Sequence, residues 1–439
     1  MDDYERGLLA FKECLLKKPA SEVKEALSEF YVLESTLKEN LHRTRLFGDN
    51  ETRRSNRAEI IYALNQLASD YCGISFNEFC ERQPDLKPKG SLRPSSGSTQ
   101  TPPLNVSTEV LTRTMPTAYC YNLSASDFPF VTVTLDNTAP GSKDIPVLVS
   151  AVVDNYSDPD TTAVSVVAQK KEHVSLLPPL RPSAIATLND TQPATLRVVI
   201  ERNTSPKDVI NTRTFPIRLH ARNTALLALK KPDDSIKDLS DYLAAWVTPR
   251  HPEIEKMLPK AARHHSRQEL VGYVADANTL PELAITVREQ ARAIFNALRD
   301  INLVYVDSAG LEVTSEQVTQ HVRLPGDTLM MGGAANCIDA SVLFASLLMA
   351  ASIDPVLVLV PGHSFVGWHI WRSVNQYEFL EMTEINKGDF DAAQQSAQRR
   401  YDKAQIKGHH ERPLFDPNGF LRVIDVVACR KKGILPLGY

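Results

Sequence analysis

The stretch from Gly332 to Trp371 limits the possible folds of this chain more than any other. It reads GGAANCIDASVLFASLLMAASIDPVLVLVPGHSFVGWHIW. Residues 338–349 place apolar side chains at helical spacing and are apolar nearly all round, so the helix that they predict must be buried. Asp354-Pro355 ends that helix, and the apolar run 356–360 predicts a buried strand. A buried helix followed by a buried strand requires a core that mixes α and β structure.

Cys337 stands at the start of the predicted helix. Asn336 is a good N-cap, and Asp339 follows three residues later, where its carboxylate can reach back to the cap. The thiol then lies in the first helical turn, where free N–H groups and the helix dipole favour a thiolate. The backbone N–H of Cys337 is a simpler donor to an oxyanion than the Asn336 amide, which we assign to the cap.

His363 opens the strand after the Pro361-Gly362 turn, where its side chain can project toward a helix N-terminus. The segment YEFLEMTEI should return as the next strand of a hairpin and bring a carboxylate to this histidine. Glu381 is the preferred acid. The hairpin register is not fixed by the sequence, so Glu378 and Glu384 remain alternatives.

The pieces NCIDASVLFASLLMAASIDPVLV, GHSFVGWHIW and FLEMT resemble the transglutaminase-like branch of the papain-like thiol fold. The resemblance is close over about residues 285–390. It implies a nucleophile at Cys337, a base at His363 that later acts as an acid, and an orienting carboxylate at Glu381. The chain departs from the family at that acid, because LEMT replaces a tetrapeptide like Val-Asp-Pro-Thr.

Three other residues of this stretch, one histidine and two tryptophans, are expected to have structural roles. His369 lies further from the turn than His363, so we expect it to pack or to face solvent. Trp368 and Trp371 are expected to pack, although either could form a wall of a cleft.

Changes in hydrophobic periodicity divide the chain. YERGLLAFKECLLKK and similar segments have helical spacing, whereas FPFVTVTLDN and later runs alternate with period two. We predict a multidomain chain with an α-helical bundle as adaptor over residues 1–85, a Pro/Ser-rich linker over 86–118, an antiparallel, immunoglobulin-like β-sandwich over 119–230, and an α+β transglutaminase/papain-like cysteine peptidase domain over 231–439.

The N-terminal segment RAEIIYALNQLASDYCGISFNEFC is similar to the small helical effector-associated domains of bacterial conflict and anti-phage systems. Such modules recruit matching modules on sensors or partners. The resemblance implies a bacterial protein that binds a protein partner through residues 1–85.

Charge and composition narrow the class of protein. The net charge of −4 over 439 residues, with no basic block, argues against a nucleic-acid surface. The start MDDYERGLLAF is acidic where a secretory signal is basic, and the most apolar stretch, 341–361, is interrupted by Asp354-Pro355. We therefore expect a soluble, cytoplasmic protein without a membrane segment.

The cysteines and histidines show no metal-binding spacing, so neither a metal nor another cofactor is predicted. His264-His265 and His409-His410 lack a third ligand and are expected in solvated loops. No pair of cysteines forms C-x-x-C, and apart from Cys337 we expect reduced structural thiols. The six cysteines are Cys14, Cys72, Cys80, Cys120, Cys337 and Cys429.

The sequence thus predicts a regulated cysteine protease that acts on a protein substrate and is recruited or activated through residues 1–85. A transglutaminase or a protein deamidase would use the same thiol site and is an open alternative. A catalytically silent interaction scaffold is the alternative from a different class.

Overall fold

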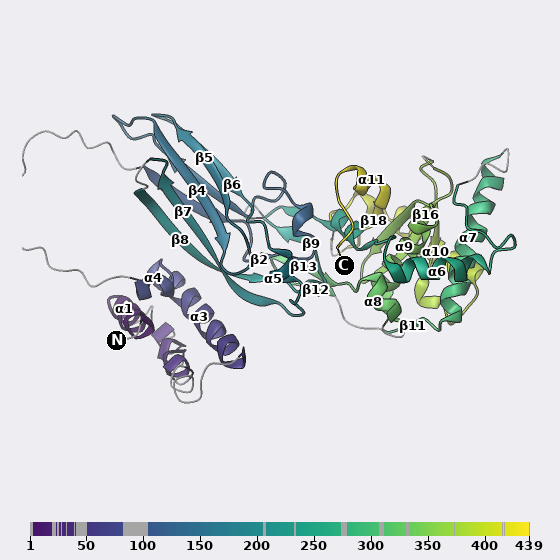
Figure 1. The fold of residues 1–439 in the computed structure, drawn as a ribbon, viewed down its shortest axis with the longest axis horizontal. Coiled ribbons are helices and arrows are strands. Elements are labelled where there is room, and N and C mark those ends of the chain that lie inside the picture. Colours follow the sequence, from purple (N-terminus) through teal and green to yellow (C-terminus); the bar gives the residue numbers. More distant parts are fainter. Residues whose placement is uncertain are drawn as a thin grey trace, which may run out of the picture. The chain divides into compact units, whose positions relative to one another are not determined.

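The computed structural model describes residues 3–19, 23, 26–27, 29–31, 33–38, 40, 51–81, 104–204, 208–231, 234–273, 279–306, 311–330, 333–372, 374–414, 416 and 418–438 (Figure 1). The chain divides into two compact units. One comprises Met1–Met115 and Ser124–His220, and the other comprises Pro116–Leu123 and Ala221–Tyr439. Helices and several sheets are both present, so the fold is multidomain and mixes α and β, as predicted.

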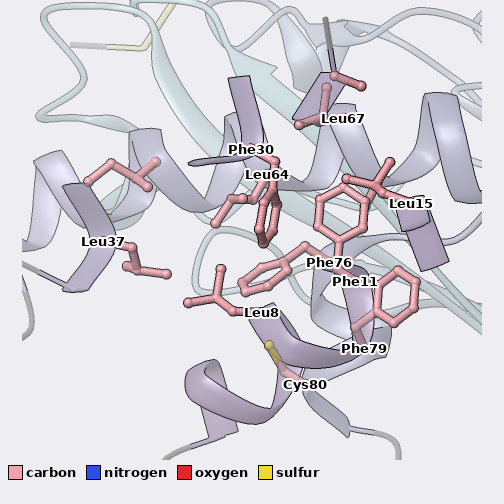
Figure 2. Close-up of a cluster of buried hydrophobic side chains, with 13 residues drawn as sticks. Leu8, Phe11, Leu15, Phe30, Leu37, Leu64, Leu67, Phe76, Phe79 and Cys80 are labelled. Atoms are coloured by element: carbon pink, nitrogen blue, oxygen red, sulfur yellow. The ribbon is translucent and has the colours of Figure 1, made fainter. Parts of the chain in front are cut away.

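The N-terminal part of the first unit is helical, as its periodicity predicts. It contains α1 (Asp3–Leu16), α3 (Glu51–Cys72) and α4 (Phe76–Glu81), and the described residues between 23 and 40 are also helical. Phe11 packs edge-on against Phe30 at 5.2 Å between ring centroids and stacks on Phe79 at 5.4 Å. Figure 2 shows the apolar core that these helices share, which includes Leu8, Phe11, Leu15, Phe30, Leu37, Leu64, Leu67, Phe76, Phe79 and Cys80.

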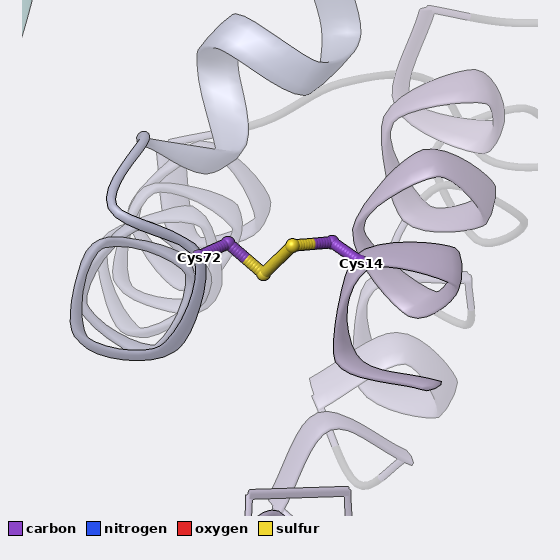
Figure 3. Close-up of a disulfide and its surroundings, with 2 residues drawn as sticks. All are labelled: Cys14 and Cys72. Carbon is purple, nitrogen blue, oxygen red and sulfur yellow. A yellow bond between two sulfur atoms is a disulfide. The ribbon is translucent and has the colours of Figure 1, made fainter. Parts of the chain in front are cut away.

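A disulfide joins Cys14 to Cys72, which corrects the prediction that both are reduced thiols (Figure 3). Cys14 lies near the end of α1, and Cys72 is the last residue of α3. The fold brings their Cα atoms to 6.3 Å, within the range that a disulfide spans. The two cysteines are 58 positions apart, so their spacing in the sequence gave no indication of the pairing.

Two sheets form the rest of the first unit. The three-stranded sheet has the order β1-β3-β6, and the five-stranded sheet has the order β2-β8-β7-β4-β5. All pairs are antiparallel except β2 with β8, and the side chains of β3 and β4 alternate between buried and less buried positions. The strands are β1 (Asn105–Val110), β2 (Thr114–Met115), β3 (Val131–Asp136), β4 (Ile145–Val153), β5 (Asp160–Val166), β6 (Lys171–Leu176), β7 (Gln192–Arg202) and β8 (Asp208–Leu219), and the short helix α5 covers Pro182–Ile185.

The predicted linker is only partly tested. Residues 86–103 lie outside the described part of the chain, but residues 105–110 form β1, which pairs with β3. The prediction is wrong for this segment, and Thr114–Met115 likewise forms β2. Val106, Thr108 and Val110 alternate with more exposed residues, a pattern of period two that the preceding Pro/Ser-rich composition obscured.

The boundary between the units differs from the one predicted at residue 230. Strand β9 (Thr224–Lys230) pairs with β13 (Gln317–His321) and β10 (Ile236–Asp238), so it belongs to the second unit. Residues 116–123 also belong there: Tyr119 is buried and donates from its hydroxyl to the Leu226 carbonyl at 2.7 Å. Strand β9 is an apolar run, buried at its five central positions, that follows β8 after a short turn, so the sequence did not show that its partners come from another sheet.

The described residues of the second unit form three sheets. Their orders are β10-β9-β13-β12, β11-β14 and β17-β16-β15-β18. The remaining strands are β11 (Val304–Tyr305), β12 (Leu311–Val313), β14 (Ala334–Ala335), β15 (Pro355–Val360), β16 (His363–His369), β17 (Tyr377–Leu380) and β18 (Arg422–Asp425). The helices are η1 (Cys120–Asn122), η2 (Ser240–Trp246), α6 (Pro252–Ala262), α7 (Leu280–Asp300), α8 (Pro325–Met330), α9 (Cys337–Ala350), η3 (Met382–Glu384), α10 (Phe390–Ile406), η4 (His409–Glu411) and α11 (Val426–Lys431).

The sheet β17-β16-β15-β18 carries α9 and α10. Ser364 and Trp368 on β16 contact Ser341 and Phe344 of α9. Alternate side chains of the sheet pack with Ala397 and Ala404 of α10. Because successive side chains of a strand point to opposite faces, the two helices cover opposite faces of this sheet. None of the helices in the described ranges combines the length and the apolar character that crossing a bilayer requires.

Candidate active site

Cys337 is the first residue of α9, as predicted. The Asp339 backbone N–H donates to Asn336 Oδ1 at 2.9 Å, and the Asp339 carboxylate reaches back to the Asn336 backbone N–H at 3.4 Å. This capping box fixes where the helix begins. The backbone N–H of Cys337 belongs to the first turn, whose N–H groups have no partner within the helix. The half-buried thiol therefore lies at the positive end of a buried helix.

His363 is the first residue of β16. Gly362 has φ of 68° in the turn from β15, a conformation that glycine adopts without strain. Ser341 fixes the relation of β16 to α9, because its hydroxyl donates to the Cys337 carbonyl at 2.7 Å and lies 3.2 Å from the Ser364 hydroxyl. The start of β16 and the start of α9 are thus linked through Ser364, the neighbour of His363, and through the carbonyl of Cys337 itself.

Glu381 follows the last residue of β17. Its Oε2 accepts from His363 Nε2 at 2.6 Å, and its Oε1 accepts from the Thr383 hydroxyl at 2.7 Å and the Thr383 backbone N–H at 3.2 Å. The carboxylate is fully buried. A buried carboxylate is stable only if hydrogen bonds and charge replace water, and these donors supply both.

The structure brings Cys337, His363 and Glu381 together. His363 interacts with the Cys337 side chain as well as with Glu381. Burial alone would lower the pKa of His363, but the bonds and charges of Cys337 and Glu381 outweigh burial and raise it to about 9. Burial alone would raise the pKa of Glu381, but the bond and charge of His363 and the Thr383 bonds lower it.

The two alternative acids have other partners. Glu378 accepts twice from Arg288 Nε, at 3.0 and 3.1 Å, and forms an ion pair with that guanidinium. Glu384 accepts from the Ser396 hydroxyl at 2.7 Å. The register of the hairpin explains why Glu381, and not Glu378 or Glu384, contacts His363. It pairs Val366 with Leu380 and so brings the residue after β17 toward the start of β16.

The other residues of this stretch take structural positions. His369 at the far end of β16 pairs with Asp425 at 3.0 Å, and the bond to Asp425 raises the pKa of this histidine despite its burial. Trp368 is fully buried between Phe344 and Phe390. Trp371 packs edge-on against Tyr273.

The histidine pairs form ordinary polar contacts. His264 lies 2.8 Å from Asp300, and His410 lies 3.6 Å from the neighbouring Glu411. His265 and His409 lie next to them in the sequence. Across the described segments, no group of three or more His, Cys, Asp or Glu side chains is placed to hold a metal ion.

Sequence reasoning missed Thr383 and Arg400. Thr383 lies two residues after Glu381, a spacing at which a side-chain oxygen can accept from the backbone N–H, and its hydroxyl donates to the same carboxylate oxygen. Arg400 Nε lies 3.2 Å from Glu381 Oε2, although the two residues are far apart in the sequence. Only the docking of α10 on the sheet places this arginine at the site.

Comparison with known proteins assigns no family. No protein-family model matches the chain, and no curated protein matches it in sequence.

Proposed function

We propose that the second unit is a cysteine-dependent hydrolase that cleaves a protein substrate. The observation that supports this is the position of His363, which interacts with the Cys337 side chain and is hydrogen-bonded to the fully buried Glu381. A thiol, an imidazole and a carboxylate linked in this order form the arrangement that activates a nucleophile. A structural cysteine does not require a histidine partner that is itself held by a buried acid.

We propose a role for each residue of this site. The Cys337 thiolate attacks a carbonyl carbon, and the backbone N–H of Cys337 stabilises the oxyanion. His363, protonated by the thiol, donates that proton to the leaving amine as the acyl-enzyme forms. It then accepts a proton from the water that hydrolyses the thioester, and the thiol is regenerated. Glu381 orients the ring through Nε2 and stabilises the imidazolium.

The resemblance to the transglutaminase-like branch of the papain-like fold supports the same assignment. The helix, strand and strand order of that family corresponds to α9, β16 and β17 in this chain. We therefore propose a transglutaminase-like domain for the second unit. For the two sheets of the first unit we propose an immunoglobulin-like sandwich.

The test uses a cysteine-reactive activity probe on the full chain, with the variants Cys337→Ala and His363→Ala. We expect labelling of the native protein only at Cys337 and no turnover in either variant. A casein substrate with and without a primary amine separates the three reactions: new termini indicate hydrolysis, amine incorporation indicates a transglutaminase, and conversion of glutamine to glutamate indicates a deamidase. A native protein that the probe does not label would instead support a silent scaffold.

We also propose that the helical bundle over residues 1–85 recruits a protein partner and thereby raises a low basal activity. The reason is that a thiol protease endangers its host unless it is controlled, and the described residues of the bundle include no candidate catalytic group. The test compares the full chain with a chain that begins at Leu104, because the strands start at Asn105. Circular dichroism must first show that the shorter chain is folded. Equal activation of both by a candidate partner would contradict the recruitment model.

The predicted cytoplasmic location stays a prediction. The Cys14–Cys72 disulfide weighs against it, because such bonds persist mainly in oxidising compartments.

A further inference from the structure

Helix α10 contacts the acid segment at three successive points of one face. The Ala393 carbonyl accepts from the Glu381 backbone N–H at 3.2 Å, and the Ser396 hydroxyl donates to Glu384 at 2.7 Å. One turn further, Arg400 Nε lies 3.2 Å from Glu381 Oε2. Positions 393, 396 and 400 are spaced by three and four residues, so they lie on the same side of the helix. This face of α10 is therefore the support on which Glu381 is held.

Arg400 shares one carboxylate oxygen with the candidate base. Oε2 of Glu381 receives His363 Nε2 at 2.6 Å and Arg400 Nε at 3.2 Å, while Thr383 occupies Oε1. Two hydrogen bonds from Thr383 thus hold Oε1, while Oε2 accepts one from His363 and forms an ion pair with Arg400. The positive charge of Arg400 beside Oε2 weakens the attraction of this oxygen for the imidazolium of His363.

The side chains of Glu381 and Arg400 differ in their exposure to solvent. The Glu381 side chain is fully buried, whereas the Arg400 side chain is 48% exposed. An exposed ion pair adds little to stability, since water and salt screen it. Arg400 is therefore poorly explained as a contribution to folding, and its contact with the histidine-bound oxygen needs another reason.

We propose that Arg400 is a positioning residue of the active site, which fixes the Glu381 carboxylate toward His363 and limits how strongly that carboxylate holds the imidazolium. The inference rests on the proposed function, because it assigns Arg400 a part in the same thiol site. A histidine that binds its proton too tightly gives it up slowly, so a second cation on the shared oxygen favours turnover.

The test compares Arg400→Gln and Arg400→Lys with a matched control, Arg399→Gln, which removes the same charge from the adjacent exposed position of α10. Histidine ring NMR on the full, substrate-free chain reports the His363 titration, and His363→Gln identifies its signal. We expect Arg400→Gln to raise the pKa of His363, Arg400→Lys to preserve most of the native value, and Arg399→Gln to leave it unchanged. With substrate, kcat should fall about 2- to 5-fold in Arg400→Gln with KM unaltered, the size expected from a half-exposed ion pair.

The His363 titration and the kinetics distinguish a failure of the Arg400 proposal from a failure of the proposed hydrolase function. The titration needs no substrate, so it tests the Arg400 contact even if the chain proves to have no hydrolase activity. A native His363 titration in Arg400→Gln would overturn the inference. Equal changes in Arg400→Gln and Arg399→Gln would overturn it as well, because they would show only a general effect of surface charge.

Discussion

His363 and Glu381 are joined at 2.6 Å, although the first opens β16 and the second follows β17, 18 positions further along the chain. The contact depends on the antiparallel pairing of β16 with β17, which brings the end of one strand beside the start of the other. It also depends on Thr383, which donates to Oε1, and on Arg400, which forms an ion pair with the fully buried carboxylate. The contact between His363 and Glu381 therefore depends on a local turn, on the register of a hairpin and on a helix further along the chain.

Iodoacetamide at neutral pH should label Cys337 before any other cysteine of the folded protein. Burial raises the pKa of Cys120 to about 11 and that of Cys429 to about 12, so both are protonated there. Cys14 and Cys72 are joined in a disulfide, and Cys80 is buried. Peptide mapping by mass spectrometry measures the order of labelling. His363→Gln is the control and should slow labelling at Cys337, whereas uniform labelling of Cys120, Cys337 and Cys429 would contradict an activated thiol.

Activity should decline as the pH rises through about 9. The pKa of His363 is raised to that value by Cys337 and Glu381 against the effect of burial, and the leaving amine needs the proton of this ring. The pH dependence of kcat/KM measures this limb in the free protein. A decline centred near 6.5 would show that the ring is not held by its partners.

The same shift predicts a pH dependence of stability. A histidine whose pKa is raised on folding stabilises the native state fully below its unfolded value of 6.5, and this contribution is lost as the pH rises through about 9. The free energy of unfolding should thus fall between these limits in the native protein. Chemical denaturation of His363→Gln over the same range should lack this component.

The position of the candidate nucleophile at a helix start could be predicted from the sequence because its evidence is local. Asn336, Asp339 and an apolar run place Cys337 at a helix start, and the predicted helix, strand and hairpin are confirmed by α9, β15, β16 and β17. The strand β1 was missed because a Pro/Ser-rich segment precedes it. Its alternation is short, and composition outweighed it in the prediction.

The sequence alone could not single out Glu381 as the candidate acid, and it could not identify the residues that contact this side chain. Glu378, Glu381 and Glu384 occur within seven positions, and a shift of a single residue in register exchanges which side chain faces which surface. Arg400 and the Cys14–Cys72 disulfide depend on how whole helices dock. Such contacts are set by tertiary packing, which the periodicity of one segment does not encode.

Glu381→Gln should lower the activity of the protein, whereas Glu378→Gln should lower its stability. The first removes the charge beside His363, and we expect kcat to fall roughly 10²- to 10⁴-fold with residual turnover. The second breaks the pair with Arg288, which should cost about 1 kcal/mol of stability while kcat stays near native. Steady-state kinetics and thermal unfolding of both variants check this. Full activity in Glu381→Gln with loss in Glu378→Gln would move the acid to Glu378.

Reduction of the Cys14–Cys72 disulfide should destabilise the helical bundle and leave the active site intact. The bond joins α1 to the end of α3 across 58 positions, and in the chain-entropy account a loop of that length stabilises the folded state by about 4 kcal/mol. Dithiothreitol should therefore lower the thermal transition of the bundle. The core around Phe11, Phe30 and Phe76 contains no other disulfide among its described residues, so the bond has no substitute there.

The variant Cys14→Ser separates this effect from that of the reductant. It should melt at the temperature of the reduced native protein and should no longer respond to dithiothreitol. The rate of Cys337 alkylation should be the same in both, because the disulfide and α9 belong to different compact units. If Cys14→Ser melts like the oxidised protein, then packing of the apolar core alone holds α1 and α3 together, and the bond adds nothing to the stability of the bundle.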